Sequence, residues 1–439
     1  MEQINNILRD DNLYKAAIQA LHGLQSNSNY LKLVTKDNSQ ASAVRKLRDT
    51  KKYLIRSGIT LQKLDTLSVI HIAGTKGKGS TCAYTEAILR EHGFKTGFFS
   101  SPHLVNARER IRISGQPISK IQFTQNFWKI YKKLEDTKEH ESDMPTYFKF
   151  LTILMFNIFL DEHVDVAIIE VGIGGLYDCT NIVRNPVCVG ITSLGLDHTS
   201  LLGNTVEDIA YQKSGIFKSG TVAFSVPQLP QAMRILEERA IERNSIQMAT
   251  EWLLTRDKVT SVSMDKIAIA LTSCKWPGRM QILRSSIGDF FLDGAHTIES
   301  IECCISWFND ISSGSKGKKV LIFNTSGTRD PIQLLIPLRS LHFYKAYFVP
   351  NLVGIKSLDN EMNSSSTDEQ RIKCEINSKI WGMNSVVANN VLEVLEDIKK
   401  NLEQKDNCER YQILVTGSLH LIGAVLAILD PNLTMNTEF

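Results

Sequence analysis

The stretch from residue 71 to residue 81, HIAGTKGKGST, decides how this chain is interpreted. The residues around it predict a buried strand at 66–74, a loop at 75–79 and a helix at 80–93 that ends at Gly93. The loop differs from the common phosphate-binding pattern G-x-x-x-x-G-K-[ST], because Gly79 separates Lys78 from Ser80.

The residue types of this loop suit an anion. Backbone N–H groups at a helix N-terminus bind phosphate, and glycines let the backbone approach closely. Lys78 would place its charge on the β and γ phosphates, and the hydroxyl of Ser80 or Thr81 would reach Mg²⁺. A glycine-rich turn without function is the alternative, and the two lysines and paired hydroxyls within a strand–loop–helix context disfavour it.

Outward from the loop, apolar strands alternate with amphipathic helices. Further strands are expected at 95–102, 164–172 and 185–195, and helices at 121–137, 146–163 and 205–218. Strands with near-continuous apolar character indicate a parallel sheet covered on both faces. The apolar run 150–160 is too short to span a bilayer and contains Asn157, so we expect a buried helix there.

A second α/β alternation follows the WPGR stretch at 276–279. Strands are expected at 289–296, 318–327, 344–352 and 411–417, helices at 297–311, 330–340 and 390–404, and a surface loop at 363–370. The sequence therefore predicts an α/β protein with a larger domain, 1–275, and a smaller one, 276–439.

Composition excludes several classes of protein. The chain has 439 residues, 43% of them hydrophobic, and a net charge of +3, which is too small to indicate a nucleic-acid partner. We expect no transmembrane segment, and the acidic N-terminus resembles no secretory or transit signal. The eight cysteines are scattered without metal-ligand spacing, so we expect reduced thiols in a cytoplasmic protein.

Polar residues follow several of the expected strands in the larger domain. Glu170 ends one strand and Asp197–His198 follow another, at the edge where ligands bind in open α/β sheets. Glu170 needs a partner if buried, which a metal ion or a salt bridge would supply. His198 is a possible metal ligand or an ordinary polar residue, and Lys213, on the next helix, is by itself compatible with a solvated lysine.

The smaller domain has its own polar strand end. Asp293 and His296 follow its first expected strand, and Arg279 of WPGR carries a planar guanidinium that suits phosphate. Each residue is weak evidence alone. Together they suggest that both domains contribute polar groups to one site.

These stretches together resemble the folylpolyglutamate synthase family of the Mur ligase superfamily, in its eukaryotic form. The matching segments lie in the same order as in the family and cover 69–86, 98–119, 147–160, 166–183, 191–220, 276–283, 292–300, 323–331 and 415–426. The resemblance implies an N-terminal P-loop ATPase domain and a C-terminal Rossmann-like ligase domain. It also implies an acid–amino-acid ligase, tetrahydrofolate synthase, that adds L-glutamate to the γ-carboxyl of a folate through an acyl phosphate, which retains folates in the cell for one-carbon metabolism.

The resemblance assigns roles to individual residues. The phosphates of ATP would be held by Gly74, Thr75, Lys76, Gly77, Lys78, Gly79 and Ser80, with Arg279 and Asp293 contacting ATP from the other domain. Catalytic roles would fall to Lys78, Lys213 and His296. Metal ligands would be Ser80, Glu170, His198 and a carbamylated Lys213, and the folate and glutamate would lie near Ser101, Pro102 and His103.

The implied cofactor is Mg²⁺, with a monovalent cation such as K⁺ as a further candidate, and ATP is a co-substrate. The expected partners are ATP, folate (poly)glutamates and L-glutamate, with no nucleic acid, and the family suggests a monomer. A mitochondrial form is compatible with the expected cytoplasmic location.

One departure from the family pattern opens an alternative. Members carry an H-Q-x-x-N-A-type helix before WPGR whose Asn contacts the adenine region, and no Asn occurs here between Asn244 and Trp276. The alternative is an inactive or weakly active nucleotide- or folate-binding paralogue. A Rossmann oxidoreductase is disfavoured because no G-x-G-x-x-G opens the first helix. The DGAHT variant at Thr297 is typical of eukaryotic members, from which dihydrofolate synthase activity is not expected.

Overall fold

The structure is a computed structural model that forms two compact units. It describes residues 2–24, 40–243, 262–314, 317–325, 330–354, 367–403 and 410–435. The first unit contains 1–102 and 107–274, and the second contains 103–106 and 275–439. The chain thus leaves the first unit briefly after Pro102 and re-enters it at Ala107.

The first unit is built on a seven-stranded sheet with the order β4-β3-β2-β5-β1-β6-β7. Its strands are β1 (Val69–Ala73), β2 (Thr96–Phe99), β3 (Ile111–Ile113), β4 (Gln116–Pro117), β5 (Val166–Glu170), β6 (Cys188–Ile191) and β7 (Val222–Ser225). The five strands from β2 to β7 in this order run parallel, and β3 and β4 add an antiparallel edge. The carboxyl ends of the parallel strands therefore share one edge of the sheet.

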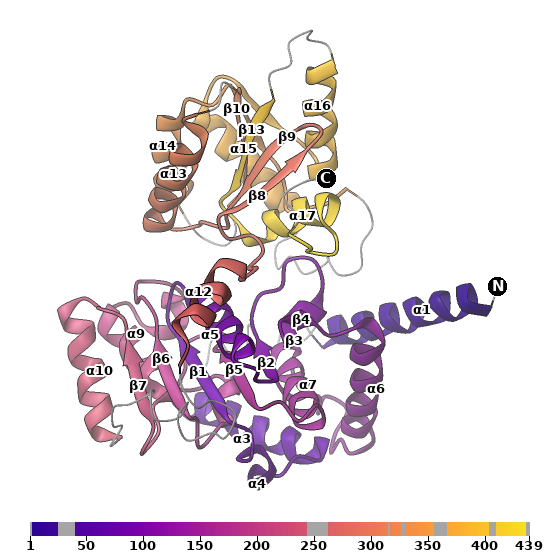
Figure 1. Ribbon diagram of the computed structural model, residues 1–439, viewed down its shortest axis with the longest axis vertical. Helices are drawn as coiled ribbons and strands as arrows, with labels where there is room; N and C mark the ends of the chain where they lie inside the picture. The colour runs from indigo at the N-terminus through magenta and orange to yellow at the C-terminus, as the bar shows by residue number, and fades with distance from the viewer. Residues whose placement is uncertain are drawn as a thin grey trace. The chain divides into compact units, whose positions relative to one another are not determined.

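The helices of the first unit are α1 (Glu2–Gly23), α3 (Gln40–Ser57), α4 (Leu61–Leu64), α5 (Lys78–Glu91), α6 (Lys120–Asp136), α7 (Tyr147–Asp161), α8 (Thr199–Leu202), α9 (Val206–Lys213), α10 (Pro230–Glu242) and α12 (Met264–Ser273), shown in Figure 1. Neighbouring residues of β2 show that they cover both faces of the sheet. Thr96 donates to Glu86 on α5, whereas a Cβ on Gly97 would lie 2.9 Å from Phe159 on α7. Because side chains alternate along a strand, α5 and α7 lie on opposite faces.

The apolar run at 150–160 is confirmed as a buried helix within α7. Its residues are buried except Leu160 at the C-terminal end, and the amide of Asn157 donates to Ser57 Oγ at 3.1 Å and to the carbonyl of Ile153 at 2.9 Å. Within the described residues, no helix is both long and apolar enough to cross a membrane.

The second unit is built on a six-stranded sheet with the order β12-β11-β10-β13-β9-β8. The strands are β8 (Gln281–Ser285), β9 (Gly288–Leu292), β10 (Lys319–Phe323), β11 (Lys345–Phe348), β12 (Ser385–Val387) and β13 (Tyr411–Thr416), all parallel to their neighbours except β8. The helices are α13 (Ile298–Ser312), α14 (Pro331–Leu338), α15 (Thr367–Trp381), α16 (Val391–Glu403) and α17 (Leu419–Leu429).

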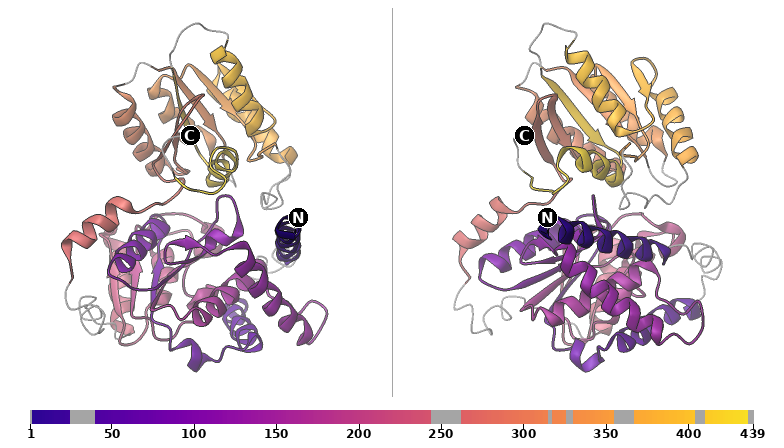
Figure 2. Two further views of the ribbon diagram at one scale, coloured as in Figure 1. Left: turned by 45° about the vertical axis from the view of Figure 1, so that its right-hand side comes forward. Right: turned by 90° about the vertical axis from the view of Figure 1, so that its right-hand side faces the viewer.

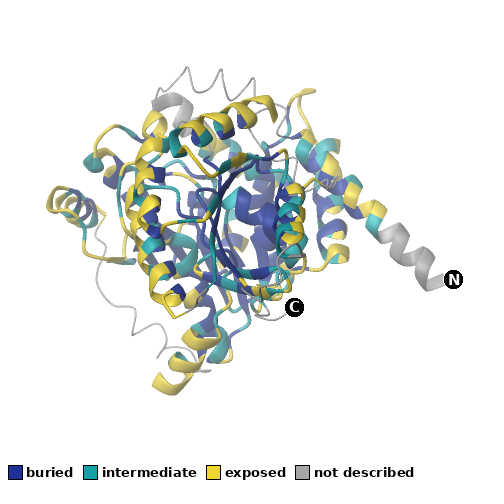
Figure 3. Ribbon diagram, turned by 90° about the horizontal axis from the view of Figure 1, so that it is seen from above, coloured by how far each residue is buried: buried dark blue, intermediate teal, exposed yellow. Residues whose placement is uncertain are grey.

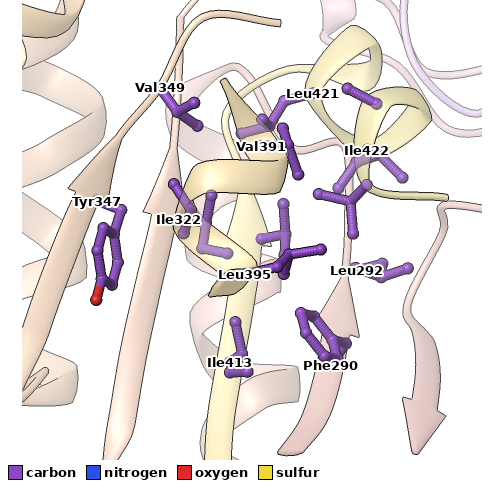
Figure 4. Packing of buried hydrophobic residues seen from close by; sticks show 14 of the residues in the cluster. Phe290, Leu292, Ile322, Tyr347, Val349, Val391, Leu395, Ile413, Leu421 and Ile422 are labelled. Carbon is purple, nitrogen blue, oxygen red and sulfur yellow. The ribbon is translucent and has the colours of Figure 1, made fainter. Parts of the chain in front are cut away.

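Two hydrophobic clusters cover the two faces of this sheet. Phe290 and Leu292 of β9 pack with residues of α16 and α17, and Figure 4 shows these side chains meeting Leu395 and Ile422. Phe291, which lies between them in the strand, packs instead with residues of α13 and α14. This alternation places the sheet between helices on both of its faces (Figure 2). Figure 3 shows buried strands in dark blue and helices that are exposed, in yellow, on their outer sides.

The predicted α/β class is therefore confirmed, while some elements differ from expectation. Helix α5 begins at Lys78 rather than at Ser80, because Gly77 takes the left-handed conformation with φ of 84° directly before it. The predicted surface loop at 363–370 is wrong for 367–370, where α15 begins, and 363–366 lies outside the described residues. Elements that were not predicted include β3, β4, β7, β8, β12, α8, α10, α12 and α15. The seven described cysteines form no disulfide with one another.

Candidate active site

The loop after β1 turns at the carboxyl edge of the first sheet. Gly74 has a φ of 151°, and a Cβ there would lie 1.8 Å from the Thr192 hydroxyl, so only glycine fits. Gly77 caps α5 and directs the N-terminus of that helix to the loop. The sequence 74–80 thus forms the strand–loop–helix turn that a phosphate-binding loop requires.

The segment after β6 holds this loop in place. The backbone N–H groups of Thr75 and Lys76 both donate to the carbonyl of Ser193, at 2.9 and 3.1 Å. The Thr75 hydroxyl donates to the carbonyl of Gly195 at 3.0 Å. These bonds join segments about 120 residues apart in the chain, so the loop has its shape only when the sheet is assembled.

Two lysines converge on one carbonyl of the loop. Lys78 Nζ donates to the Gly74 carbonyl at 3.0 Å, and Lys213 Nζ donates to the same oxygen at 2.8 Å. Lys213 is buried at the end of α9. Burial, and then the nearby Lys78 cation, lower the pKa of Lys213 to about 7, while Asp197 and Asp178 act in the opposite direction. A substantial fraction of Lys213 is therefore neutral near physiological pH.

Glu170 lies on the neighbouring strand at the same edge. It is the last residue of β5, opposite Ile72 in β1, and it is 5% exposed. The backbone N–H of Ser101 donates to its Oε2 at 3.1 Å. Burial, and then the Glu170 carboxylate, raise the pKa of the Cys82 thiol, while the Lys78 cation lowers it. Glu170 and Lys78 therefore both lie close enough to Cys82, near the start of α5, to affect its charge.

The expected metal ligands fall into two groups. Ser80, in the first turn of α5, and Glu170 supply a hydroxyl and a carboxylate, which are the hard oxygen donors that Mg²⁺ prefers. Among the described residues, no group of three or more His, Cys, Asp or Glu side chains could hold a metal ion by itself. The pair of oxygen donors from Ser80 and Glu170 fits Mg²⁺, because this ion binds to one or two protein oxygens together with substrate phosphates.

His198 belongs to the second group. It is exposed, with a left-handed φ of 52°, at the N-cap of the short helix α8. Its neighbour Asp197 lies 3.7 Å from the Lys76 ammonium, so this segment reaches the phosphate loop through a charge pair.

The three residues expected near the folate follow β2. Ser101 donates its backbone N–H to Glu170, as described, and is followed by a cis peptide bond to Pro102. His103 is buried and clusters with the second unit. The next residue, Leu104, packs against that unit's hydrophobic cluster.

In the second unit, Asp293 follows β9 and is held by backbone groups from both ends of the β8–β9 hairpin. Its two carboxylate oxygens accept from the backbone N–H groups of Met280 and Ala295, both at 2.9 Å. Burial raises the pKa of Asp293, and the Arg279 cation and these N–H groups counteract the shift. Nearby, the ring Nδ1 of His296 lies 2.6 Å from the Gly294 carbonyl. The three predicted residues therefore lie close together at one end of the β8–β9 hairpin, with Arg279 just before β8 and Asp293 and His296 just after β9.

Sequence reasoning did not identify the residues that support the first site. Ser193, Gly195 and Thr192 shape the phosphate loop, yet nothing in their local sequence distinguishes them from an ordinary strand end. Asp178 and Thr180 lie in the segment 171–181, from which the sequence analysis selected no residue. Their signal was the glycine-rich stretch GIGGLYDCTN, since such a segment is built for close backbone packing.

Comparison with curated proteins shows similarity over almost the whole chain. No protein-family model matches. The chain is 37% identical to the mitochondrial folylpolyglutamate synthase of Bos taurus, with 96% of this chain and 93% of the bovine one covered. It is 40% identical to the human mitochondrial enzyme, covering 84% of this chain and 73% of the human one, and 36% identical to folylpolyglutamate synthase of Arabidopsis thaliana, with 83% and 80% covered. The bovine alignment extends over 546 positions, so the bovine sequence carries segments that this 439-residue chain lacks.

Solved structures share the same architecture. FolC of E. coli in complex with DHPP and ADP has a TM-score of 0.69 at 26% identity, covering 88% of this chain and 93% of that one. Folylpolyglutamate synthase of Mycobacterium tuberculosis, complexed with ADP and AMPPCP, has a TM-score of 0.69 at 22% identity, covering 88% and 99%, and supports the fold. The two-unit α/β architecture, the modified phosphate loop and the extent of these similarities show that the chain belongs to the folylpolyglutamate synthase family of ATP-dependent ligases.

Proposed function

We propose that this protein joins the amine of L-glutamate to the γ-carboxyl of a tetrahydrofolate mono- or polyglutamate and consumes one ATP for each bond. The observation that carries the proposal is the convergence of Lys78 and Lys213 on the Gly74 carbonyl, beside Glu170 at the same sheet edge. The Lys78 cation at a phosphate loop serves a reaction in which a carboxylate must approach a triphosphate.

The proposed reaction has two steps. A γ-carboxylate oxygen of the folate attacks the γ-phosphorus of ATP, so that an acyl phosphate forms and ADP leaves. The neutral amine of glutamate then attacks the acyl carbon, an amide bond forms, and inorganic phosphate leaves with the bonding electrons while the amine loses a proton. Exclusion of water protects the acyl phosphate from hydrolysis between the two steps.

In this proposal residues 1–275 form the ATP-binding domain and residues 276–439 form the ligase domain. The backbone of 74–80 cradles the phosphates, and Lys78 neutralises the β and γ oxygens. The second unit contributes Arg279 and Asp293 to ATP binding and His296 near the transferred phosphate and the glutamate. The segment 101–103 serves the folate and glutamate.

Mg²⁺ is proposed to be held by Ser80 and Glu170, with His198 and a carbamylated Lys213 serving a second ion. When bound, Mg²⁺ would neutralise charge on the phosphates as ATP and the carboxylate approach each other. Carbamylation is favoured by the low pKa of Lys213, because only the neutral amine attacks CO₂ to form a C–N bond and release a proton. We further propose that a monovalent cation such as K⁺ activates the enzyme. Activity should then be higher in K⁺ than in Na⁺ at the same concentration.

The modified lysine has its own test. Lys213→Ala is expected to lose activity at least about tenfold, and a short added carboxylate is expected to restore part of it, since it replaces the missing anion. Absence of rescue, together with full activity under strict removal of CO₂ and bicarbonate, would exclude the carbamate and leave the ligase assignment intact.

We further propose a monomeric enzyme of the cytoplasm with a mitochondrial form, consistent with the mitochondrial relatives from mammals. Size-exclusion chromatography with light scattering and cell fractionation test these two points.

The decisive experiment is a turnover assay with ATP, Mg²⁺, tetrahydrofolate and labelled glutamate, in which the chain length of the product is measured. Glutamate-dependent ADP release with elongated folate is the expected result. Folate or nucleotide binding without product would instead support the inactive paralogue. That alternative rested on the missing Asn segment, most of which falls at 244–261, outside the described residues. The similarities to folylpolyglutamate synthases do not support it.

A further inference from the structure

A buried histidine lies in the strand that leads to the phosphate loop. His71 is in the middle of β1, is 0% exposed, and pairs through its backbone register with Ile169 of β5 and Val189 of β6. Its ring Nε2 lies 2.8 Å from the Thr180 hydroxyl oxygen, which is 109 residues away in the chain. Its other nitrogen, Nδ1, is buried with no hydrogen-bond partner within the described part of the chain.

The direction of the hydrogen bonds follows from chemistry. Thr180 Oγ1 lies 2.6 Å from Asp178 Oδ1. An ionised carboxylate only accepts, so the hydroxyl proton of Thr180 goes to Asp178 and the Nε2–H of His71 donates to Thr180. Burial raises the pKa of Asp178, and the donors from Thr180 and Ile173 counteract this shift. Burial lowers the pKa of His71 to about 3, which keeps the ring neutral, in the Nε2–H form.

Asp178 closes the segment that follows Glu170. Its Oδ2 accepts from the backbone N–H of Ile173 at 3.1 Å, and its Oδ1 accepts from the backbone N–H of Thr180 at 2.9 Å. One carboxylate therefore ties both ends of the segment 173–180 together.

The closed segment packs backbone to backbone against the end of α9. Leu176 N–H donates to the Gln212 carbonyl at 2.7 Å, and a Cβ on Gly175 would lie 2.7 Å from the Lys213 carbonyl. On the other side, a Cβ on Gly215 would lie 2.3 Å from Leu176. No side chain separates the two backbones here, so a displacement of the segment must displace Lys213.

We propose that His71 and Thr180 are positioning residues that, through Asp178 and the segment 173–180, fix Lys213 against the phosphate loop. The two ends of this chain of contacts meet in one segment, because Lys213 donates to the carbonyl of Gly74, which lies three residues after His71. The proposal rests on the proposed function in that it makes the position of Lys213 matter for ligation.

Two matched pairs of variants test it. Thr180→Val removes the hydroxyl with little change in shape, whereas Thr180→Ser keeps it. His71→Leu removes the ring donor, whereas His71→Gln places an amide N–H near the position of Nε2. We expect Thr180→Val and His71→Leu to lower kcat by about 10- to 100-fold through displacement of Lys213, while Thr180→Ser and His71→Gln stay within about threefold of wild type.

The value of kcat in the fully folded state separates positioning from mere stabilisation. Displacement of Lys213 from the Gly74 carbonyl should lower kcat in Thr180→Val but not in Thr180→Ser, even where both variants are fully folded. Assays run well below the melting temperature of each variant. A Thr180→Val enzyme that is less stable but has an unchanged kcat would overturn the proposal.

A third measurement needs no turnover. ¹⁵N NMR of histidine-labelled protein at pH 7 should show His71 as the neutral Nε2–H tautomer, assigned by its loss in His71→Gln, and Thr180→Val should shift its Nε2 signal. A protonated ring or the Nδ1–H tautomer would refute the hydrogen-bond order. If wild type makes no polyglutamate, the proposed function is wrong, and this measurement still decides whether the His71–Thr180 connection exists.

Discussion

The two sheet edges that carry the predicted site residues are built in different ways. At the edge of the first unit, the supporting bonds join distant segments: Lys213 to Gly74 across 139 residues and Ser101 to Glu170 across 69. At the edge of the second unit they are local, since Met280 and Ala295 reach Asp293 across 13 and 2 residues. The first site therefore exists only in the assembled sheet, whereas the second is largely a property of the β8–β9 hairpin and the segments that flank it.

The largest effect is expected at the phosphate loop. Lys78→Ala should lower the rate of glutamate ligation by about 10²- to 10³-fold, because it removes charge where charge develops in the transition state. Unfolding by circular dichroism should be unchanged, since Lys78 faces the loop rather than the core. Lys129→Ala, which removes an exposed lysine paired with Asp161, is the control and should keep full activity. Equal rates in the two variants would remove Lys78 from the site.

The local turn of the second unit should respond through stability. Asp293→Ala leaves the N–H groups of Met280 and Ala295 without their acceptor and should lower the free energy of unfolding by about 2–3 kcal/mol. Asp293→Asn keeps one acceptor oxygen and should lose about half as much. Urea unfolding measures both, and identical curves for the two variants would contradict the hydrogen-bond account of this turn.

A substitution at Glu170 can remove a charge from the sheet edge of the first unit without disturbing the fold. Glu170→Gln keeps an oxygen for the N–H of Ser101 but removes the charge. The Mg²⁺ concentration for half-maximal activity should rise about tenfold or more. Glu135→Gln, a change at a half-buried residue on α6 that pairs with Lys138, provides the matched control. An unaltered Mg²⁺ titration would argue against Glu170 as a ligand.

The smallest expected effect concerns the pH dependence of stability. His71 has a pKa of about 3 when folded and close to 6.5 when unfolded, so between these values the unfolded chain binds more protons and stability falls as pH falls. Between pH 7.5 and 5.5 the wild type should lose about 1.3 kcal/mol more than His71→Gln. Parallel pH profiles of unfolding for the two proteins would show that His71 is not buried as a neutral ring.

The strongly periodic elements were predictable because their apolar pattern records burial directly. The helix at 146–163 and the strands that end at Ala73 and Glu170 are examples. Strand β8 and helix α15 were missed for the opposite reason. Residues 281–285 mix polar and apolar side chains on an antiparallel edge, and α15 is largely polar, with Gln370, Cys374 and Asn377 buried.

The sequence by itself determined the alternation of strands and helices, the glycines and lysines of the phosphate loop, and the family to which the chain belongs. These are local signals, set by periodicity and by conformations that only glycine adopts. Only the tertiary structure decided that Lys213 donates to Gly74, and that His71 reaches Asp178 through Thr180. Such contacts depend on the order of strands in the sheet, and pairing across more than a hundred residues leaves no local mark in the chain.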